Sequence, residues 1–166
     1  MLYVHSYDFD TPFGDIAIAA GDEAVKAIWF AGRTRQVPID MNLAQRAETP
    51  LIRETNAWIR AYLDKKRPDP SSIPLELTGS DFRKEVLQLI TTVPYGQVIN
   101  YGEIAKEIAR RRGIEKMAAQ AVGGAVASND ILLLIPCHRV VGARGSIGGY
   151  NCGLDIKRWL LAHERE

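Results

Sequence analysis

Three consecutive residues near the end of the chain carry side chains that could do chemistry together. Cys137, His138 and Arg139 follow an apolar run that ends at Pro136. A cysteine thiolate is a strong nucleophile, and a neighbouring cation lowers the pKa of its thiol. An imidazole and a guanidinium do not belong in an apolar core. These residues therefore predict a nucleophilic cysteine at an electropositive, partly exposed rim.

The apolar run 131–135 also supports a second interpretation. Five apolar residues in succession are typical of a buried strand or core segment, and a cysteine after such a run is most often an inert buried thiol. Pro136 should end regular pairing because it has no N–H and a fixed φ. In a strict strand Cys137 and His138 would point to opposite faces, so their coupling needs a turn or a bridging water.

Composition is that of a globular protein and excludes several classes. The chain has 166 residues, 46% hydrophobic and 25% charged, enough for one large or two small domains. No apolar run approaches the roughly 18 residues of a membrane helix, and no signal peptide is visible. Cys137 and Cys152 form neither a disulfide framework nor a four-ligand zinc site. We expect a protein of the reducing cytosol that needs no metal.

Charge is distributed unevenly although the net charge is only +1. Residues 1–80 carry 9 Lys/Arg and 11 Asp/Glu, a net charge of −2. Residues 81–166 carry 12 Lys/Arg and 9 Asp/Glu, a net charge of +3. The basic excess centres on Arg110, Arg111 and Arg112. Such a run is usually a solvated turn, but it can also bind phosphate.

The first third of the chain has the pattern of a sheet. Residues 3–7, 14–19 and 24–30 alternate between turn signals, which predicts a three-stranded antiparallel meander. His5 lies in this pattern and is taken as structural. Residues 32–48 are polar and are expected to be irregular.

A helix and a proline-rich segment follow the sheet. Thr49 can cap a helix over residues 50–65. Three prolines in residues 66–74 break regular structure, and they mark the boundary between a domain of residues 1–75 and a domain of residues 76–166.

The second domain is expected to be helical. Helices are predicted over residues 81–92, 101–109, 114–127 and 154–163, with a basic turn at residues 110–113. Two short helices joined by a glycine-containing turn are typical of a helix-turn-helix. Small side chains on the second of them allow either close helix packing or a close approach to nucleic acid, with no side chain that would read a base. The small residues are Ala118, Ala119, Ala121, Gly123, Gly124 and Ala125.

The motif Pro136-Cys137-His138-Arg139-Val140 resembles the active-site signature of the O6-alkylguanine-DNA alkyltransferases. Other segments resemble the same family in order and spacing, so that the likeness covers residues 79–164 well and the first domain loosely. They are Pro94–Val98, Tyr101–Ala105, Ala121–Ala125, Asn129, Gly148–Tyr150 and Trp159–Glu164.

This resemblance implies a fold and a reaction. The fold would be α/β: a ribonuclease H-like lobe, with an antiparallel sheet and a flanking helix, then a helix-turn-helix domain that carries the cysteine. The Cys137 thiolate would take the alkyl group from O6-alkylguanine, and from O4-alkylthymine, in double-stranded DNA after the base is flipped out. The protein would act once, as a monomer, without a cofactor, in the cytoplasm or, in a eukaryote, the nucleus.

The resemblance also implies roles for individual residues. His138 would take the thiol proton through a water, and Glu164 would orient His138. Tyr101 would give a proton to the departing guanine. Asn129 would hold the backbone around the thiol. The base pocket would be lined by Val140, Tyr150 and Asn151.

One position departs from the family. Gln120 stands where the family has the arginine that fills the gap left by the flipped base. We expect extrusion to be weaker by roughly 1–2 kcal/mol, because glutamine has no charge. Phosphate contacts from the basic run could compensate. Residues assigned to DNA besides Gln120 are Ala118, Ala119, Ala121, Gly123, Arg110, Arg111, Arg112 and Arg139.

Three rival functions stay open at the level of sequence. A lesion-binding protein that recruits other repair machinery would lack the cysteine of this chain. A thiol hydrolase would need a strand–nucleophile–helix elbow, which is not visible. A helix-turn-helix regulator would need base-reading side chains. Cys152, which stands where the family more often has a small polar residue, is either a harmless small side chain or a partner for Cys137 in an oxidative disulfide.

Overall fold

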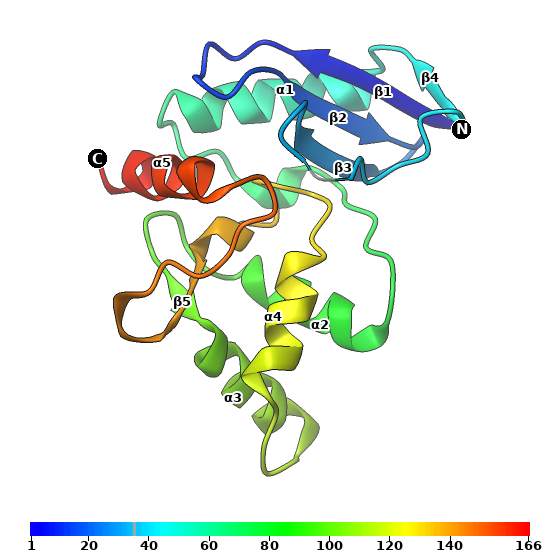
Figure 1. The fold of residues 1–166 in the computed structure, drawn as a ribbon. Helices are drawn as coiled ribbons and strands as arrows, with labels where there is room; N and C mark the ends of the chain where they lie inside the picture. The colour runs from blue at the N-terminus through cyan, green and yellow to red at the C-terminus, as the bar shows by residue number, and fades with distance from the viewer. Residues whose placement is uncertain (35) are drawn as a thin grey trace. The chain divides into compact units, whose positions relative to one another are not determined.

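The computed structural model describes residues 1–34 and 36–166, which form two compact units. The N-terminal unit comprises Met1–Leu77 and Asp130–Leu133, and the C-terminal unit comprises Thr78–Asn129 and Leu134–Glu166 (Figure 1). The first division lies two residues after the predicted boundary. The sequence did not predict that Asp130–Leu133 belong to the N-terminal unit.

The N-terminal unit contains the predicted antiparallel meander. Strands β1 (Leu2–Tyr7), β2 (Ile16–Ala20) and β3 (Val25–Phe30) pair in antiparallel fashion, with Val4 opposite Ala19. A short fourth strand, β4 (Ala44–Arg46), pairs in parallel with β1, so the order is β3-β2-β1-β4. The prediction of irregular structure was therefore wrong for these three residues. Backbone pairing along the open edge of β1 does not require apolar side chains.

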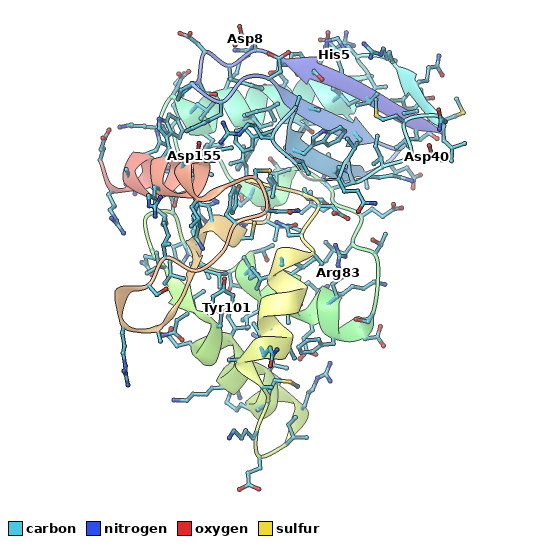
Figure 2. All side chains as sticks on the ribbon, in the orientation of Figure 1. His5, Asp8, Asp40, Arg83, Tyr101 and Asp155 are labelled. Atoms are coloured by element: carbon cyan, nitrogen blue, oxygen red, sulfur yellow. The ribbon has the colours of Figure 1, made fainter. Side chains whose placement is uncertain are left out.

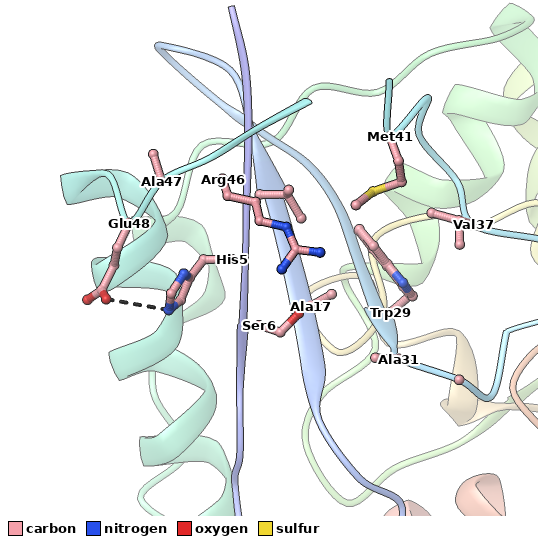
Figure 3. Close-up of a pocket in the computed structure, with 12 residues that line it drawn as sticks. His5, Ser6, Ala17, Trp29, Ala31, Val37, Met41, Arg46, Ala47 and Glu48 are labelled. Atoms are coloured by element: carbon pink, nitrogen blue, oxygen red, sulfur yellow. Dashed lines mark ion pairs between the residues drawn. The ribbon is translucent and has the colours of Figure 1, made fainter. Parts of the chain in front are cut away.

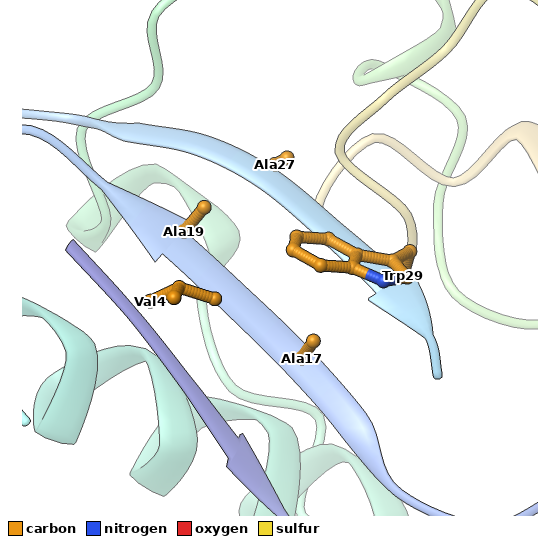
Figure 4. Close-up of a cluster of buried hydrophobic side chains, with 5 residues drawn as sticks. All are labelled: Val4, Ala17, Ala19, Ala27 and Trp29. Atoms are coloured by element: carbon orange, nitrogen blue, oxygen red, sulfur yellow. The ribbon is translucent and has the colours of Figure 1, made fainter. Parts of the chain in front are cut away.

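The core of this unit covers both faces of the central strand. All five residues of β2 are buried. One face carries Ala17 and Ala19 in a cluster with Val4, Ala27 and Trp29 (Figure 4). Helix α1 (Pro50–Leu63) also contacts β2.

Helix α1 begins where the sequence predicts. The Thr49 side chain accepts a hydrogen bond from the backbone N–H of Ile52, and Pro50 occupies the first helical position. Its buried residues include Ile52, Ile59 and Tyr62, so one face of the helix lies in the core.

The C-terminal unit is mainly helical. Its helices are α2 (Asp81–Ile90), α3 (Tyr101–Arg112), α4 (Ala119–Ala127) and α5 (Leu154–Arg165). Two of their boundaries correct the sequence prediction. Arg110–Arg112 form the last turn of α3 rather than a loop, and Gly113 ends the helix in the left-handed conformation. Helix α4 begins at Ala119, five residues later than predicted, because the preceding segment is not helical.

Two very short strands brace this unit beside the cysteine. Strand β5 (Ile99–Asn100) pairs in parallel with β6 (Val140–Val141), with Ile99 opposite Val140. Strand β5 leads directly into α3, and β6 follows the Cys137 turn directly. The pairing therefore fixes the start of α3 next to the segment that carries the thiol.

The apolar run before the cysteine is buried but is not a regular strand. Ile131 forms a single bridge with Ile28, whose N–H donates to Asp130 and whose carbonyl accepts from Leu132, at 2.9 and 3.1 Å. Leu133 then has a φ of 70°, which interrupts extended structure. The run is thus a core segment anchored to β3. No helix within the described part of the chain is long and apolar enough to cross a membrane.

Candidate active site

The Cys137 thiol lies inside the C-terminal unit. Cys137 opens a 3-10 turn (Cys137–Arg139) directly after Pro136, and only 5% of its surface is exposed. Burial raises the pKa of its thiol to about 11, while a hydrogen bond from Asn129 and the charge of Lys157 act in the opposite direction. The expected exposed rim with a lowered thiol pKa was therefore wrong. At neutral pH the resting sulfur is a protonated thiol.

The His138 imidazole is paired with a carboxylate from the last helix. His138 is completely buried, and its Nε2 lies 2.6 Å from Oε2 of Glu164 on α5. Burial holds the pKa of His138 below its usual value, although the Glu164 carboxylate opposes this effect. A neutral imidazole that donates from Nε2 to Glu164 has Nδ1 as its basic nitrogen. The residue can thus accept one proton.

Glu164 collects donors from several segments. The backbone N–H of Gly96 donates to its Oε1 at 3.1 Å, and Arg139 donates through Nε at 2.8 Å and Nη2 at 3.1 Å. Together with His138, these groups surround a carboxylate that is almost fully buried. Gly96 has a φ of 80°, and a Cβ there would lie 3.2 Å from the Glu164 carbonyl oxygen, so a side chain at this position would be strained and crowded.

The Arg139 guanidinium faces inward. Besides Glu164, it donates from Nη1 to the carbonyl of Val93 at 2.8 Å, and it lies 5.7 Å from the centre of the Tyr95 ring. Only 8% of the residue is exposed. The assignment of Arg139 to DNA contact does not fit this position. The residue instead fixes the carboxylate that holds His138.

Lys157 is a buried cation that was not predicted from the sequence. Its Nζ donates to the carbonyls of Val140 at 2.6 Å and Gly149 at 2.9 Å, and its side chain is fully buried. Burial lowers its pKa to about 8, and the Cys137 thiolate would raise it. Lys157 and Glu164 are seven residues apart, hence on one face of α5. Two charges on the buried face of an amphipathic helix were a signal that could have been noticed.

Asn129 and Tyr101 come from two other segments of the same unit. The Asn129 side-chain amide donates to the Ile135 carbonyl at 3.0 Å, which closes the loop before the cysteine. Tyr101 is the first residue of α3 (Figure 2). A Cβ on Gly148 would lie 2.9 Å from the Tyr101 hydroxyl oxygen, so the glycine lets the 148–150 backbone lie against the phenol.

The three residues assigned to the base pocket differ in exposure. Val140 is buried and gives its carbonyl to Lys157, Tyr150 is half-buried, and Asn151 is exposed. Cys137 and Cys152 are both buried free thiols. Within residues 1–34 and 36–166, no three side chains of the metal-binding types form a group that could hold an ion.

Helix α4 presents a surface of small side chains. Ala118, Ala119, Gln120 and Ala121 are all exposed, and Gly123 is half-buried. No atom lies within 4 Å of a Cβ built on Gly124, so packing inside the protein does not require glycine there. Gly in a helix costs about 0.5–1 kcal/mol relative to Ala. Close intramolecular packing therefore does not explain the glycine at position 124.

The far end of helix α4 is held by an arginine from α2. Arg83 donates from Nε to the Ser128 hydroxyl at 2.8 Å and from Nη2 to the Ser128 carbonyl at 2.6 Å. Its Nη1 donates to the Thr78 carbonyl. This fixes the C-terminus of α4 while its N-terminus carries no side-chain cap. The open backbone N–H groups at that end attract negative charge.

The three arginines at the end of α3 are exposed but paired. Arg110 and Arg111 contact Glu107 at 2.7 and 2.8 Å. Arg112 contacts Glu85 at 2.8 Å. The hydrogen bonds from Arg110 and Arg111 lower the pKa of Glu107 to about 2. Any phosphate contact from these arginines has to compete with the carboxylates of Glu107 and Glu85, and these pairings were not predicted from the sequence.

The sequence of the chain resembles those of known proteins. The sequence model of a protein family, the DNA-binding domain of 6-O-methylguanine DNA methyltransferase, matches residues 81–166. The chain is 34% identical to the methylated-DNA–protein-cysteine methyltransferase of Methanosarcina acetivorans, over 94% of this chain and 95% of that relative. It is also 34% identical to the Homo sapiens protein of that name, over 93% of this chain and 77% of the relative.

Solved structures give the same result for the fold. The chain is similar to Mycobacterium tuberculosis OGT in complex with DNA, with a TM-score of 0.82, 30% identity, and coverage of 98% of this chain and 93% of that one. It is also similar to the O6-methylguanine-DNA methyltransferase of Pyrococcus kodakaraensis, with a TM-score of 0.68, 25% identity and 99% coverage of both chains. The predicted mixed α/β fold is confirmed.

Proposed function

The chain belongs to the O6-methylguanine DNA methyltransferase family, and from this premise we propose how its own residues carry out the reaction. Members of the family repair DNA by moving an alkyl group from a damaged base to a cysteine of the protein. The oxygen–carbon bond of the lesion breaks and a sulfur–carbon bond forms. A thioether has no easy route back to a thiol, so each molecule acts once.

Cys137 is the acceptor in this proposal. The observation that carries it is the buried Cys137, which is followed directly by an imidazole paired with a buried carboxylate. A hydrogen bond from Asn129 and the charge of Lys157 both favour the thiolate form of Cys137. With a thiol pKa of about 11 and a His138 pKa below its usual value, the resting pair is neutral. Thiolate forms only as the reaction proceeds, which protects the sulfur from other electrophiles.

His138 and Tyr101 transfer the protons in this proposal. The thiol proton passes to Nδ1 of His138 through a water, and the resulting imidazolium is stabilised by Glu164 at 2.6 Å. Tyr101 supplies a proton to the guanine as it leaves. Lys157 stabilises the developing thiolate by its charge. Arg139 and the Gly96 N–H keep the carboxylate in place throughout.

DNA is bound by helix α4. The exposed residues Ala118, Ala119 and Ala121 let the duplex backbone come close, and the open space beside Gly124 serves the same purpose. A substrate atom inside the base stack has to be reached by rotating the nucleotide out. Gln120 occupies the gap, and Arg110, Arg111 and Arg112 contribute phosphate contacts in competition with Glu107 and Glu85.

The proposal also covers the residues that line the base pocket, a second substrate and the cellular location. Tyr150, Asn151 and Val140 line the pocket, and Lys157 fixes its wall through the Val140 and Gly149 carbonyls. O4-alkylthymine is a second substrate. The protein acts as a monomer wherever the genome lies, in the cytoplasm with the nucleoid or in a nucleus.

The test is single-turnover transfer of a labelled methyl group. Wild type is incubated with duplex carrying radiolabelled O6-methylguanine, and the labelled peptide is mapped. We expect at most one equivalent of label, on Cys137, and none on the Cys137→Ser variant, which still binds DNA. Cys152→Ser is the matched control and should retain transfer.

This experiment, together with an assay of ester hydrolysis, separates the rival functions. Binding of lesion DNA without label would identify a recruiting protein. Hydrolysis of a small ester with turnover would identify a thiol hydrolase. Label on another residue in the Cys137→Ser variant would remove Cys137 as the acceptor.

A further inference from the structure

The N-terminal unit contains a groove that the transfer reaction does not use. It has a volume of about 610 Å3 and lies over one face of the sheet (Figure 3). Every residue that lines it belongs to the N-terminal unit, and none is assigned to alkyl transfer or to DNA.

The floor and one rim of the groove are apolar. Val4, Ala17 and Trp29 form the floor, and all three are buried within the cluster on this face of the sheet. Val37 and Met41 form the rim, where they are 42% and 43% exposed. A flat apolar group would therefore find a preformed indole beside a flexible thioether.

The opposite side of the groove carries one positive charge. Arg46 is held on β4 by its pairing with Val4 on β1. Figure 3 shows its guanidinium directed into the space between Ser6 and Trp29. Across the described residues 1–34 and 36–166, no carboxylate forms an ion pair with Arg46. The nearby carboxylate, Glu48, pairs with His5 at 3.6 Å.

We propose that this groove binds a small molecule in which one anionic group is attached to a flat apolar body. The guanidinium of Arg46 would receive the anion in a forked hydrogen bond, and the body would lie against Trp29. The volume is within the roughly 300–1,000 Å3 of small-molecule sites. A protein partner would need a contact of at least about 1,000 Å2, which this groove does not offer by itself.

A matched pair of ligands tests the charge. The full-length protein is labelled with 15N and titrated with 1-naphthoate and with 1-naphthamide, which differ in charge but scarcely in shape. We expect naphthoate to shift the indole N–H of Trp29 and the backbone amides of Gly32 and Ala47, with at least about tenfold weaker binding of the amide. Equal binding of the two, or no shift at these groups, would overturn the proposal.

Two variants test the residues. Arg46→Met should weaken naphthoate binding about tenfold, and Val37→Glu, which puts a carboxylate on the exposed rim, should weaken it at least as much. Lys66→Met removes a charge from an exposed position outside the groove and should have no effect. Unchanged binding by either groove variant would contradict the assignment.

Methyl transfer provides an independent readout. All three variants should transfer methyl groups at the wild-type rate, so the groove can fail as a site without affecting the proposed function. If these resonances instead shift with protein concentration and not with naphthoate, a second copy of the chain covers the groove and the small-molecule site is wrong.

Discussion

The C-terminal unit contains two arginine–glutamate clusters of similar geometry and opposite surroundings. In the buried cluster Arg139 meets Glu164 at 2.8 Å, and in the exposed cluster Arg110 and Arg111 meet Glu107 at 2.7 and 2.8 Å. Distance therefore does not distinguish them. Burial does, because water and salt screen a surface pair, whereas a buried ion that loses its partner has nothing to replace it.

The two clusters also act on different groups. The exposed arginines lower the pKa of Glu107 to about 2, but no reactive group depends on that carboxylate. The buried carboxylate also holds His138, the proposed proton acceptor, and takes up the N–H of Gly96. We infer that chemistry and stability are coupled in the buried cluster and uncoupled in the exposed one.

Glu164→Gln should have the largest effect. It leaves the Arg139 guanidinium buried without a counter-ion and gives His138 a neutral partner. We expect the free energy of unfolding to fall by about 3–5 kcal/mol, and methyl transfer to slow sharply. Urea unfolding and single-turnover transfer measure the two effects.

A double variant checks the cause of that loss. Arg139→Met combined with Glu164→Gln removes both charges and should recover part of the stability, while transfer stays slow because the partner of His138 is still missing. If the double variant is no more stable than Glu164→Gln alone, an unpaired guanidinium is not the reason for the loss.

Lys157→Met should change the pH dependence of stability. The folded-state pKa of Lys157 is about 8 against an ordinary 10.5, so the unfolded chain binds more protons between these values. The contribution of Lys157 to the free energy of unfolding thus increases with pH across that window, by up to about 3 kcal/mol. This increase should be absent in Lys157→Met. Urea unfolding from pH 7 to 10.5 measures it.

Cys137→Ser is the matching control for that titration. The folded-state pKa of Cys137 is about 11, above an ordinary 9.0, so its contribution to stability falls with pH between 9 and 11. The serine variant should lose this fall and keep the rise from Lys157. An unchanged pH profile in Lys157→Met would mean that the ammonium is not desolvated.

Gln120→Arg should have a smaller effect, seen only with DNA. An arginine on the exposed surface of α4 adds a positive charge where we propose that residue 120 fills the gap left by the flipped base, so binding of lesion duplex should tighten about tenfold. Fluorescence anisotropy with a labelled duplex measures the affinity. Protein stability should be unchanged, and unchanged or weaker binding would count against the role of residue 120.

Glu107→Gln should have the smallest effect. Its partners are solvent-exposed arginines, so we expect no measurable change in melting temperature and an unchanged transfer rate. The freed arginines become more available to phosphate, so we expect the salt dependence of DNA binding to stay the same or to increase. A stability loss comparable to that of Glu164→Gln would remove the contrast between the two clusters.

Local signals in the sequence were sufficient for much of the fold. The Thr49 cap, the alternation of β1 to β3 and the burial of the apolar run all depend on neighbouring residues, and the structure agrees. Strand β4 was missed because it pairs through backbone at the edge of β1. Helix α3 is one turn longer than predicted because three arginines are good helix formers at a C-terminus.

The site was harder to predict because its electrostatics depend on distant residues. The sequence places Cys137, His138 and Arg139 together, but it does not show that the Val93 carbonyl and the Gly96 N–H lie beside them. These groups, with Glu164, make burial of the triplet possible. For the same reason the thiol pKa is raised and not lowered.

The segment Asp130–Leu133 belongs by its contacts to the N-terminal unit, although by sequence it interrupts the C-terminal one. A protein fragment of residues 78–166 would contain this segment but would lack Ile28, whose backbone forms hydrogen bonds with Asp130 and Leu132. Ile131, Leu132 and Leu133 would then be uncovered just upstream of the acceptor cysteine, which favours aggregation. We therefore expect residues 78–166 to aggregate more readily as a fragment than as part of the whole chain.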